Sequence, residues 1–155
     1  MTTPDKGKTP DNLAETRRTL PIALLRAREA VMERFRPLLA AHDISEQQWR
    51  VMRVLLEAGE SDATQLSRLA NVLAPSLTRM LRTLEARGFT TLRKDPGDAR
   101  RALITLTDAG RGFIRTLAPE SAAIYAAIEA RLGRDRIDHI LDELDFLLQS
   151  LAEAS

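Results

Sequence analysis

The stretch from Leu73 to Leu84 constrains the fold of this chain more than any other part of the sequence. Its large apolar residues recur every three or four positions, which places them on one stripe of a helix. They are Leu73, Leu77, Met80, Leu81 and Leu84. Pro75 lies near the first turn, where its missing N–H costs little. The other side and its flanks carry Ser76, Thr78, Arg79, Arg82 and Thr83. We therefore predict a helix that is packed on one side and covered with hydroxyl and guanidinium groups on the other.

A shorter helix is predicted directly before this one. Asp62-Ala63-Thr64-Gln65 has the form of a helix start, and the helix should span about residues 62–70. Its inward side chains are Leu66, Leu69 and Ala70. Residues 71–74 form the turn, and the second helix, which we call the reading helix, runs to Arg87 and ends at Gly88 with a left-handed cap. Two helices joined by so short a turn are typical of a helix-turn-helix.

A β-hairpin is predicted after the reading helix. Residues 89–93 and 102–106 have the composition of strands. Pro96-Gly97 marks a turn within residues 94–101, which form a basic tip. A helix-turn-helix followed by a hairpin suggests a winged helix-turn-helix. In such a fold, hydroxyl and guanidinium groups of the reading helix contact phosphates and base edges in the major groove of DNA.

The rest of the chain is predicted to be helical. A long helix over residues 13–41 has Pro21 and Pro37 as candidate break points. Ser45-Glu46-Gln47-Gln48 has the form of a capping box, which opens a helix that ends near Gly59. Beyond the hairpin, Thr107-Asp108 should cap a helix over residues 107–131, and a last helix follows over residues 134–152. The last helix has a heptad seam made of Ile137, Leu141, Leu144, Leu148 and Leu151. This seam needs a partner, either the chain's own first helix or a second subunit.

Positive charge is concentrated on the predicted reading helix and hairpin. The formal net charge is only +1, but residues 68–101 hold eight basic and three acidic side chains. A basic patch of this kind is the electrostatic footprint of a phosphate-binding surface. The absence of cysteine excludes disulfides, cysteine-ligated zinc and thiol redox switches. No signal-peptide-like segment or apolar run of about 18 residues occurs, so we expect a cytoplasmic protein with no membrane partner.

The order of these elements resembles the MarR (multiple antibiotic resistance regulator) family over roughly residues 13–151. Three motifs carry the resemblance: the reading helix with its closing glycine at residues 76–88, Asp98-Ala99-Arg100 in the wing, and residues 106–110 at the strand-to-helix junction. The resemblance implies a mainly α fold with a small β-hairpin wing. It also implies a homodimer, with residues 12–44 and 108–155 as a helical dimerisation region and residues 45–107 as the winged helix-turn-helix DNA-binding lobe. Residues 1–11 lack apolar periodicity and are expected to form a disordered tail.

Three further stretches resemble the branch of this family that regulates homoprotocatechuate (4-hydroxyphenylacetate) degradation operons. They are residues 25–29, 48–53 and 73–79. The resemblance implies a dimeric repressor that binds a pseudo-palindromic operator in double-stranded DNA and is released by a small aromatic carboxylic acid. Within the family, the alternative is a multidrug-type repressor with a loose apolar pocket.

The predicted DNA contacts begin with the N-terminal part of the reading helix. Ser76, Thr78 and Arg79 approach the bases there, and Pro75 shapes the entry. The guanidinium fork of Arg79 fits O6 and N7 of guanine, although a salt bridge that holds the helix is the alternative. Arg82 is expected to contact a phosphate.

The wing is predicted to supply a second set of contacts. Arg100 would reach into the minor groove or along the backbone with Asp98 orienting it; alternatively, an Asp98–Arg100 pair only stiffens the hairpin. Arg93, Lys94 and Arg101 are expected to attract phosphates in general.

The resemblance places effectors between the dimerisation helices and the DNA-binding lobe. Trp49 and Arg53 lie one turn apart on a predicted helix, and together they could hold an aromatic carboxylate by stacking and bidentate hydrogen bonding. Arg26 and Arg28 on the first helix are further candidates. The alternative is that Trp49 fills the core and Arg53 forms an ordinary ion pair. His42 and His139 have no second ligand at metal spacing, so we expect neither a metal site nor a cofactor.

Two other classes of protein fit the sequence less well. An enzyme is disfavoured, because the sequence has no Gly-rich phosphate loop, nucleophile elbow or metal-ligand cluster. A helical dimer adaptor that does not bind DNA would use the same heptad seam. It would leave the basic segment at residues 68–101 unexplained.

Overall fold

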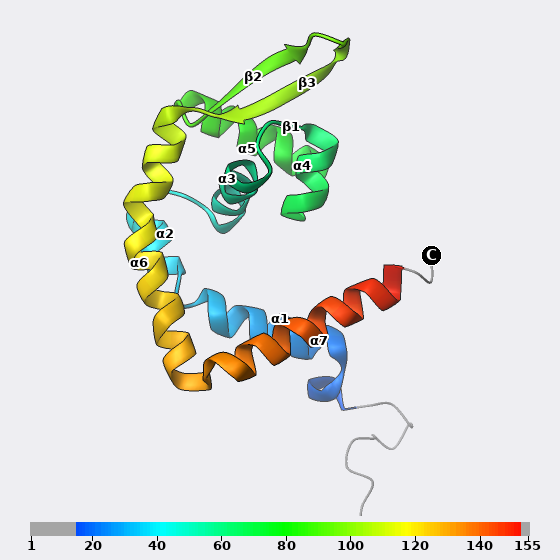
Figure 1. Cartoon of the computed structure of the whole chain (residues 1–155), viewed down its shortest axis with the longest axis vertical. Helices are drawn as coiled ribbons and strands as arrows, with labels where there is room; N and C mark the ends of the chain where they lie inside the picture. Colours follow the sequence, from blue (N-terminus) through cyan, green and yellow to red (C-terminus); the bar gives the residue numbers. More distant parts are fainter. Residues whose placement is uncertain (1–14, 153–155) are drawn as a thin grey trace, which may run out of the picture.

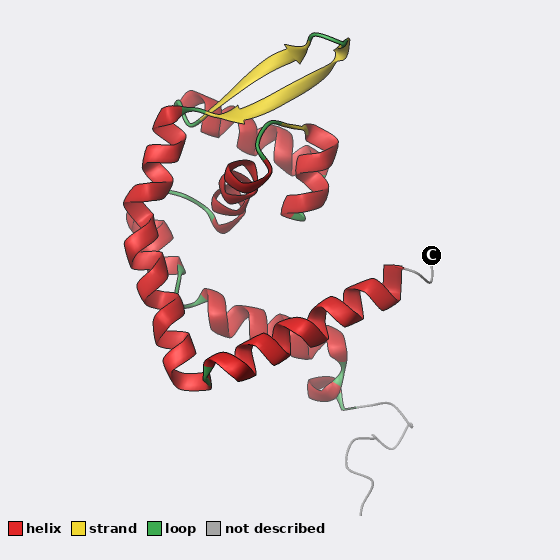
Figure 2. Cartoon of the chain, viewed as in Figure 1, coloured by secondary structure: helices red, strands yellow, loops and turns green. Residues whose placement is uncertain are grey.

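The computed structural model describes residues 15–152 of the chain, and its shape is an open C (Figure 1). The long helix α6 (Asp108–Leu132) forms the back of the C and joins two arms. One arm is a lobe of helices α3 (Glu46–Ala58), α4 (Ala63–Ala70) and α5 (Ala74–Ala86) with a small sheet. The other arm holds α1 (Leu20–Met32) and α7 (Arg134–Ala152). The mainly α fold with a hairpin wing is thereby confirmed (Figure 2). The predicted disordered tail at residues 1–11 lies outside the described residues.

The first predicted helix is divided at both of its prolines. A short 3₁₀ turn, η1 (Thr16–Arg18), precedes α1, and α2 (Arg36–Ala41) follows it. Pro21 and Pro37 each lie in the first turn of their helix, where the missing N–H would have no partner. The break at residues 33–35 lets α2 turn toward the lobe, where Leu38 and Leu39 are buried.

Side-chain caps start three of the helices where the sequence predicts them. Ser45 and Gln48 exchange both hydrogen bonds of a capping box at α3, each at 3.1 Å. Asp62 accepts the N–H of Gln65 at 2.7 Å, and Thr107 accepts that of Gly110 at 3.0 Å. The helices pack through fully buried residues that include Val51, Met52, Leu66, Leu84 and Leu117. This core fixes the position of α5.

The sheet has one strand more than predicted. Strands β2 (Thr90–Asp95) and β3 (Asp98–Leu106) form the hairpin, and β1 (Ser61–Asp62) pairs with the other edge of β3 in the order β1-β3-β2. All pairs are antiparallel, with Ser61 and Leu92 both opposite Ile104. The hairpin strands reach to Asp95 and Asp98, so the eight-residue segment predicted to lie between the strands is too long, while the turn at Pro96-Gly97 lies where it was predicted. The exposed charged residues of that segment lack the apolar alternation that marks a strand.

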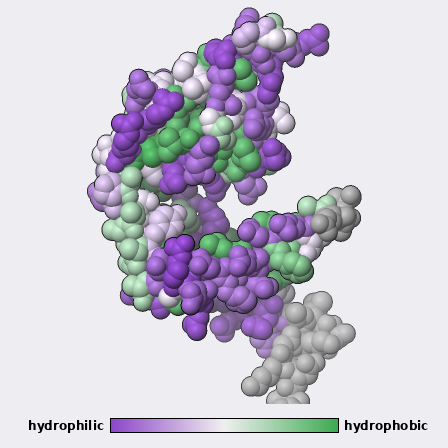
Figure 3. Space-filling view, viewed as in Figure 1, coloured by the Kyte–Doolittle hydropathy of each residue, from purple (hydrophilic) through white to green (hydrophobic). Residues whose placement is uncertain are grey.

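The predicted heptad seam on α7 remains mostly open in the protomer. Leu141, Leu148 and Leu151 are more than half exposed, and Ile137 and Leu144 are half-buried. Apolar patches are visible along this arm in Figure 3. The ends of α1 and α6 and the start of α7 also line an apolar groove of about 420 Å³. The chain's own first helix therefore leaves the seam largely uncovered.

Candidate nucleic-acid interface and effector pocket

Helix α5 has the predicted division into a packed face and an open face. Leu77, Met80, Leu81 and Leu84 are at most 9% exposed. The assignment of Leu73 to the packed stripe is wrong, because Leu73 is 78% exposed. It occupies the N-cap in an extended conformation ahead of the helix, beyond the reach of the core. Leu69, also predicted inward, is 43% exposed at the end of α4.

The open face of α5 presents the predicted reading residues. Pro75, Thr78, Arg79 and Arg82 are exposed, and Ser76 is half-buried. The hydroxyl of Thr78 donates to the carbonyl of Ala74 at 3.1 Å, so its hydrogen atom is used within the helix. Within residues 15–152, neither arginine forms an ion pair. The helix-holding salt bridge considered for Arg79 is thus absent from this part of the chain.

Two of the predicted wing cations are paired with carboxylates. Arg93 donates to both carboxylate oxygens of Glu60, at 2.6 and 2.8 Å. Arg101 lies 2.7 Å from Asp62 and 3.2 Å from Asp95. The hydrogen bond from Arg93 lowers the pKa of Glu60. The pKa of Asp62 is lowered most by the hydrogen bond from the N–H of Gln65 and next by the hydrogen bond from Arg101. These two arginines hold the wing against β1.

The other wing cations remain open to solvent. Among the described residues, Lys94 and Arg100 have no ion-pair partner, and both are exposed. Asp98 accepts the backbone N–H of Arg100 at 3.0 Å and makes no ion pair with its guanidinium. Asp98 therefore shapes the turn, and the Arg100 side chain is left to extend from the wing.

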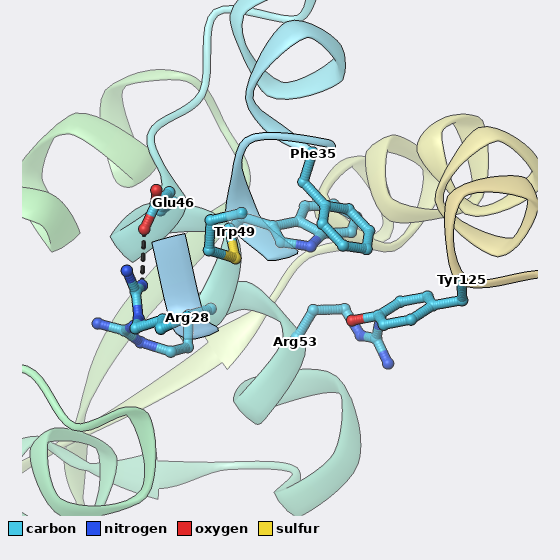
Figure 4. A pocket seen from close by; sticks show the side chains of 8 residues that line it. Arg28, Phe35, Glu46, Trp49, Arg53 and Tyr125 are labelled. Atoms are coloured by element: carbon cyan, nitrogen blue, oxygen red, sulfur yellow. Dashed lines mark hydrogen bonds and ion pairs between the residues drawn. The ribbon is translucent and has the colours of Figure 1, made fainter. Parts of the chain in front are cut away.

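Three of the four predicted effector residues meet in one pocket of about 270 Å³ (Figure 4). Arg28 comes from α1, and Trp49 and Arg53 come from α3. Arg26 is exposed and is not part of the lining. The sequence reasoning missed the other lining residues, which are Met32, Phe35, Glu46, Arg50 and Tyr125. The spacing of residues 46, 49, 50 and 53 signals one shared helix face, but the contribution of α6 has no local signal.

The pocket combines aromatic surfaces with an excess of positive charge. The rings of Phe35 and Tyr125 lie 4.8 Å apart, and the Arg53 side chain extends toward Tyr125 in Figure 4. The guanidinium carbon of Arg53 is 6.0 Å from the centre of the Trp49 ring. The Nε atom of Arg53 is buried without a hydrogen-bond partner within residues 15–152. The alternative prediction was that Trp49 fills the core and Arg53 forms an ordinary ion pair. It also holds in part, because Trp49 packs against the core and Arg53 pairs with Glu57 at 3.1 Å.

An ion-pair cluster closes one end of the pocket. Glu46 accepts from Arg28 at 2.7 Å and from Arg36 at 2.9 Å, and Arg36 also donates to Glu29 at 2.7 Å. The hydrogen bond from Arg28 is the largest cause that lowers the pKa of Glu46. The cluster ties the break between α1 and α2 to the first turn of α3. An anion in this pocket would meet one carboxylate and three guanidiniums, those of Arg28, Arg50 and Arg53.

In the part of the chain that the structure describes, no group of three or more His, Cys, Asp or Glu residues could hold a metal ion. None of the helices in this part combines the length and apolar character needed to cross a membrane.

Helices α4 and α5, which are joined by a short turn and followed by the β2–β3 hairpin, define a winged helix-turn-helix protein. The model of the MarR family matches residues 44–102. The transcriptional regulator FarR of Neisseria gonorrhoeae is 40% identical over 75% of this chain and 80% of its own length. The homoprotocatechuate degradative operon repressor of Escherichia coli is 36% identical over 87% of this chain and 93% of its own length. The chain belongs to the MarR family, and these two relatives are a transcriptional regulator and an operon repressor.

Solved structures agree with this assignment. NadR in complex with 4-hydroxyphenylacetate is 36% identical, with a TM-score of 0.81 over 88% of this chain and 100% of that chain. The transcriptional repressor CouR, bound to a 23-mer DNA duplex, is 28% identical, with a TM-score of 0.77 over 84% of this chain and 92% of that chain. Both similarities extend well beyond the winged helix-turn-helix lobe.

Proposed function

We propose that this protein is a dimeric repressor of an aromatic-acid catabolic operon, that it binds a pseudo-palindromic operator, and that an aromatic acid releases it. The observation that carries the proposal is the pocket in which an indole, a phenol and three guanidiniums surround one cavity. Aromatic rings stack on an aromatic ligand, and guanidiniums bind its carboxylate. The names of the E. coli relative and of the NadR complex support acids of the homoprotocatechuate and 4-hydroxyphenylacetate type.

DNA binding is proposed to use the open face of α5 and the free wing cations. Arg79 reads a guanine, Arg82 contacts a phosphate, and Lys94 and Arg100 attract the backbone beside the groove. Arg93 and Arg101 contribute less, because Glu60, Asp62 and Asp95 already partner them. The structure of CouR bound to a DNA duplex supports binding to double-stranded DNA.

Dimerisation is proposed to bury the open seam of α7 and the apolar groove beside it. Exposed Ile140, Leu141, Leu148 and Leu151 supply the apolar surface, whose removal from water drives association. Two subunits related by a two-fold axis would place their α5 helices in successive major grooves, about 34 Å apart. A pseudo-palindromic operator follows from that symmetry.

The test is operator binding with and without an aromatic acid. Duplexes that tile the DNA upstream of the protein's own gene are titrated by fluorescence anisotropy across a salt series, with 4-hydroxyphenylacetate, homoprotocatechuate or neither present. We expect one duplex to bind tightly, with a steep salt dependence, and either acid to weaken that binding. Failure to prefer any duplex over random DNA would overturn the proposed operator. Binding that neither acid alters would overturn the proposed effector.

Ligand binding can be followed separately because Trp49 is the sole tryptophan of the chain and lines the pocket. We expect an acid that enters the pocket to change the fluorescence of this indole. Phenol and benzyl alcohol, which lack the carboxylate, serve as matched controls and should bind far more weakly. Equal binding of the acids and of these two neutral compounds would favour a loose multidrug-type pocket.

A further inference from the structure

Arg50 lines the pocket and also hydrogen-bonds to the turn between α4 and α5. It lies on the same face of α3 as Glu46, Trp49 and Arg53 and lines the pocket with them. Its Nη2 atom donates to the backbone carbonyl of Asn71, at a distance of 3.4 Å. Asn71 is the residue that ends α4. A single guanidinium therefore faces both the effector pocket and the connection between α4 and α5.

The carbonyl that Arg50 contacts belongs to a conformationally demanding position. Asn71 has φ 51° and ψ 55°, in the left-handed region that costs an ordinary residue free energy. The next residue, Val72, is buried, and its carbonyl accepts a hydrogen bond from the hydroxyl of Ser67. Leu73 then forms the N-cap of α5. A change at the Asn71 carbonyl thus acts two residues ahead of that N-cap.

Arg50 is only loosely held in place. A donor–acceptor distance of 3.4 Å is longer than a strong N–H···O bond, whose usual range ends near about 3.2 Å. Its Nε atom is buried without a partner, and within residues 15–152 it pairs with no carboxylate. Arg28 and Arg53, by contrast, are each paired with a glutamate. A half-buried cation with an unmet donor binds an incoming carboxylate more strongly than it binds a neutral carbonyl.

We infer that Arg50 couples effector binding to the position of the reading helix. An aromatic carboxylate in the pocket attracts the Arg50 guanidinium and breaks its contact with the Asn71 carbonyl. The turn ahead of α5 is then freed, and the two α5 helices of the dimer lose the arrangement that fits the operator. Arg50 is a positioning residue in this scheme, because it acts on DNA through the turn. The inference rests on the proposed function, since it assumes that an acid in this pocket weakens operator binding.

The test measures coupling separately from either affinity. Operator affinity is measured for the full-length dimer of the wild type and of Arg50→Met at increasing 4-hydroxyphenylacetate, and acid binding is followed by Trp49 fluorescence. Typical coupling between two sites is about 5- to 150-fold. We expect the wild type to lose at least about fivefold in operator affinity at saturating acid, a loss within that range. Arg50→Met should bind the acid more weakly, and without acid it should bind the operator about as weakly as the acid-saturated wild type, because the contact with Asn71 is already absent. At saturating acid it should lose less than about twofold further, because the path between the sites is cut.

Arg53→Met is the matched control, since Arg53 lines the same pocket and makes no described hydrogen bond to the turn. The Arg53→Met variant should need a higher acid concentration. At saturating acid, its operator affinity should fall as much as that of the wild type. If Arg50→Met shows the same coupling as the wild type, the role proposed for Arg50 is overturned but the proposed function is not. A wild type that shows no coupling would overturn the proposed effector and this inference together. An Arg50→Met protein that loses thermal stability but keeps its coupling would assign Arg50 a purely structural role.

Discussion

Arg101 and Asp62 join the wing to the helix-turn-helix through an ion pair 2.7 Å long. The same carboxylate caps α4 by accepting the N–H of Gln65, also at 2.7 Å. One side chain thereby fixes the start of α4 and holds strand β3 of the hairpin. Glu60 makes the parallel connection two residues earlier, through Arg93 and the hydroxyl of Thr105. The wing is held as part of the lobe by these two carboxylates.

Replacing Asp62 with Asn should flatten the dependence of stability on pH. The pKa of Asp62 is lowered in the folded protein, so its charge stabilises the fold above the unfolded pKa of about 3.9. That stabilisation is lost as the pH falls through the lower folded pKa. Asn caps a helix nearly as well as Asp, so Asp62→Asn removes the charge and keeps the cap. Thermal unfolding from about pH 5 to pH 2 should show a smaller fall in Tm for the variant than for the wild type.

Glu85→Gln is the control for this measurement. Glu85 is exposed on α5 and forms no ion pair among the described residues. Its variant should follow the wild-type fall in Tm with pH. A similar flattening in both variants would mean that net charge, and not the Asp62 contacts, sets the acid stability.

Gly110 should tolerate no side chain, although it lies in the first turn of a helix. A Cβ atom there would lie 2.3 Å from the carbonyl oxygen of Phe89, a backbone atom that cannot move aside. Gly110→Ala should lower the free energy of unfolding by at least about 2 kcal/mol, as overpacking does in other cores. Urea unfolding at a fixed protein concentration measures this effect.

Gly112, two residues further along α6, provides the contrast. A Cβ atom at Gly112 would meet nothing within 4 Å. Gly112→Ala should raise the free energy of unfolding by up to about 1 kcal/mol, because alanine favours a helix more than glycine does. Equal destabilisation by both variants would refute the close approach to Phe89 as the cause.

Local sequence signals locate most of the secondary structure, because caps and prolines act within a few residues. Ser45, Asp62 and Thr107 cap α3, α4 and α6 as predicted, and Pro21 and Pro37 mark two helix starts. On α3, the one-turn spacing of Trp49 and Arg53 predicted that they act together, and the same spacing could have added Glu46 and Arg50. Motifs and periodicity are local properties, so they are visible without the fold.

Contacts between distant segments could not be predicted in this way. Glu60 lies 33 residues from Arg93, and Asp62 lies 39 residues from Arg101, so nothing in the local pattern joins them. The two-residue strand β1 brings both pairs together and is too short to have a periodic signal. The exposure of Leu73 could not be predicted either. Leu73 fits the helical spacing of the packed stripe, but the core does not extend to it.

The paired and unpaired arginines should differ in their effect on operator binding. Arg79→Ala removes an unpaired guanidinium from the open face of α5 and should weaken binding by about 10- to 100-fold, the cost of one lost bidentate base contact. Arg93→Ala removes a cation that already pairs with Glu60, so its loss should be smaller. Anisotropy titrations at several salt concentrations compare the two. Equal losses would contradict the division of the basic residues into DNA contacts and wing supports.

Arg28 and Arg26 should differ just as clearly in effector binding. Arg28→Gln removes one cation from the pocket and leaves Glu46 with Arg36 alone, so an acid would meet more negative charge there. Its affinity for 4-hydroxyphenylacetate, measured by Trp49 fluorescence, should fall by about tenfold, the cost of a hydrogen bond to a charged group. Arg26→Gln makes the same change in net charge on an exposed side chain outside the pocket lining and should leave the affinity unchanged. A similar fall in both variants would show that the acid responds to the general charge of α1 and not to Arg28 in the pocket.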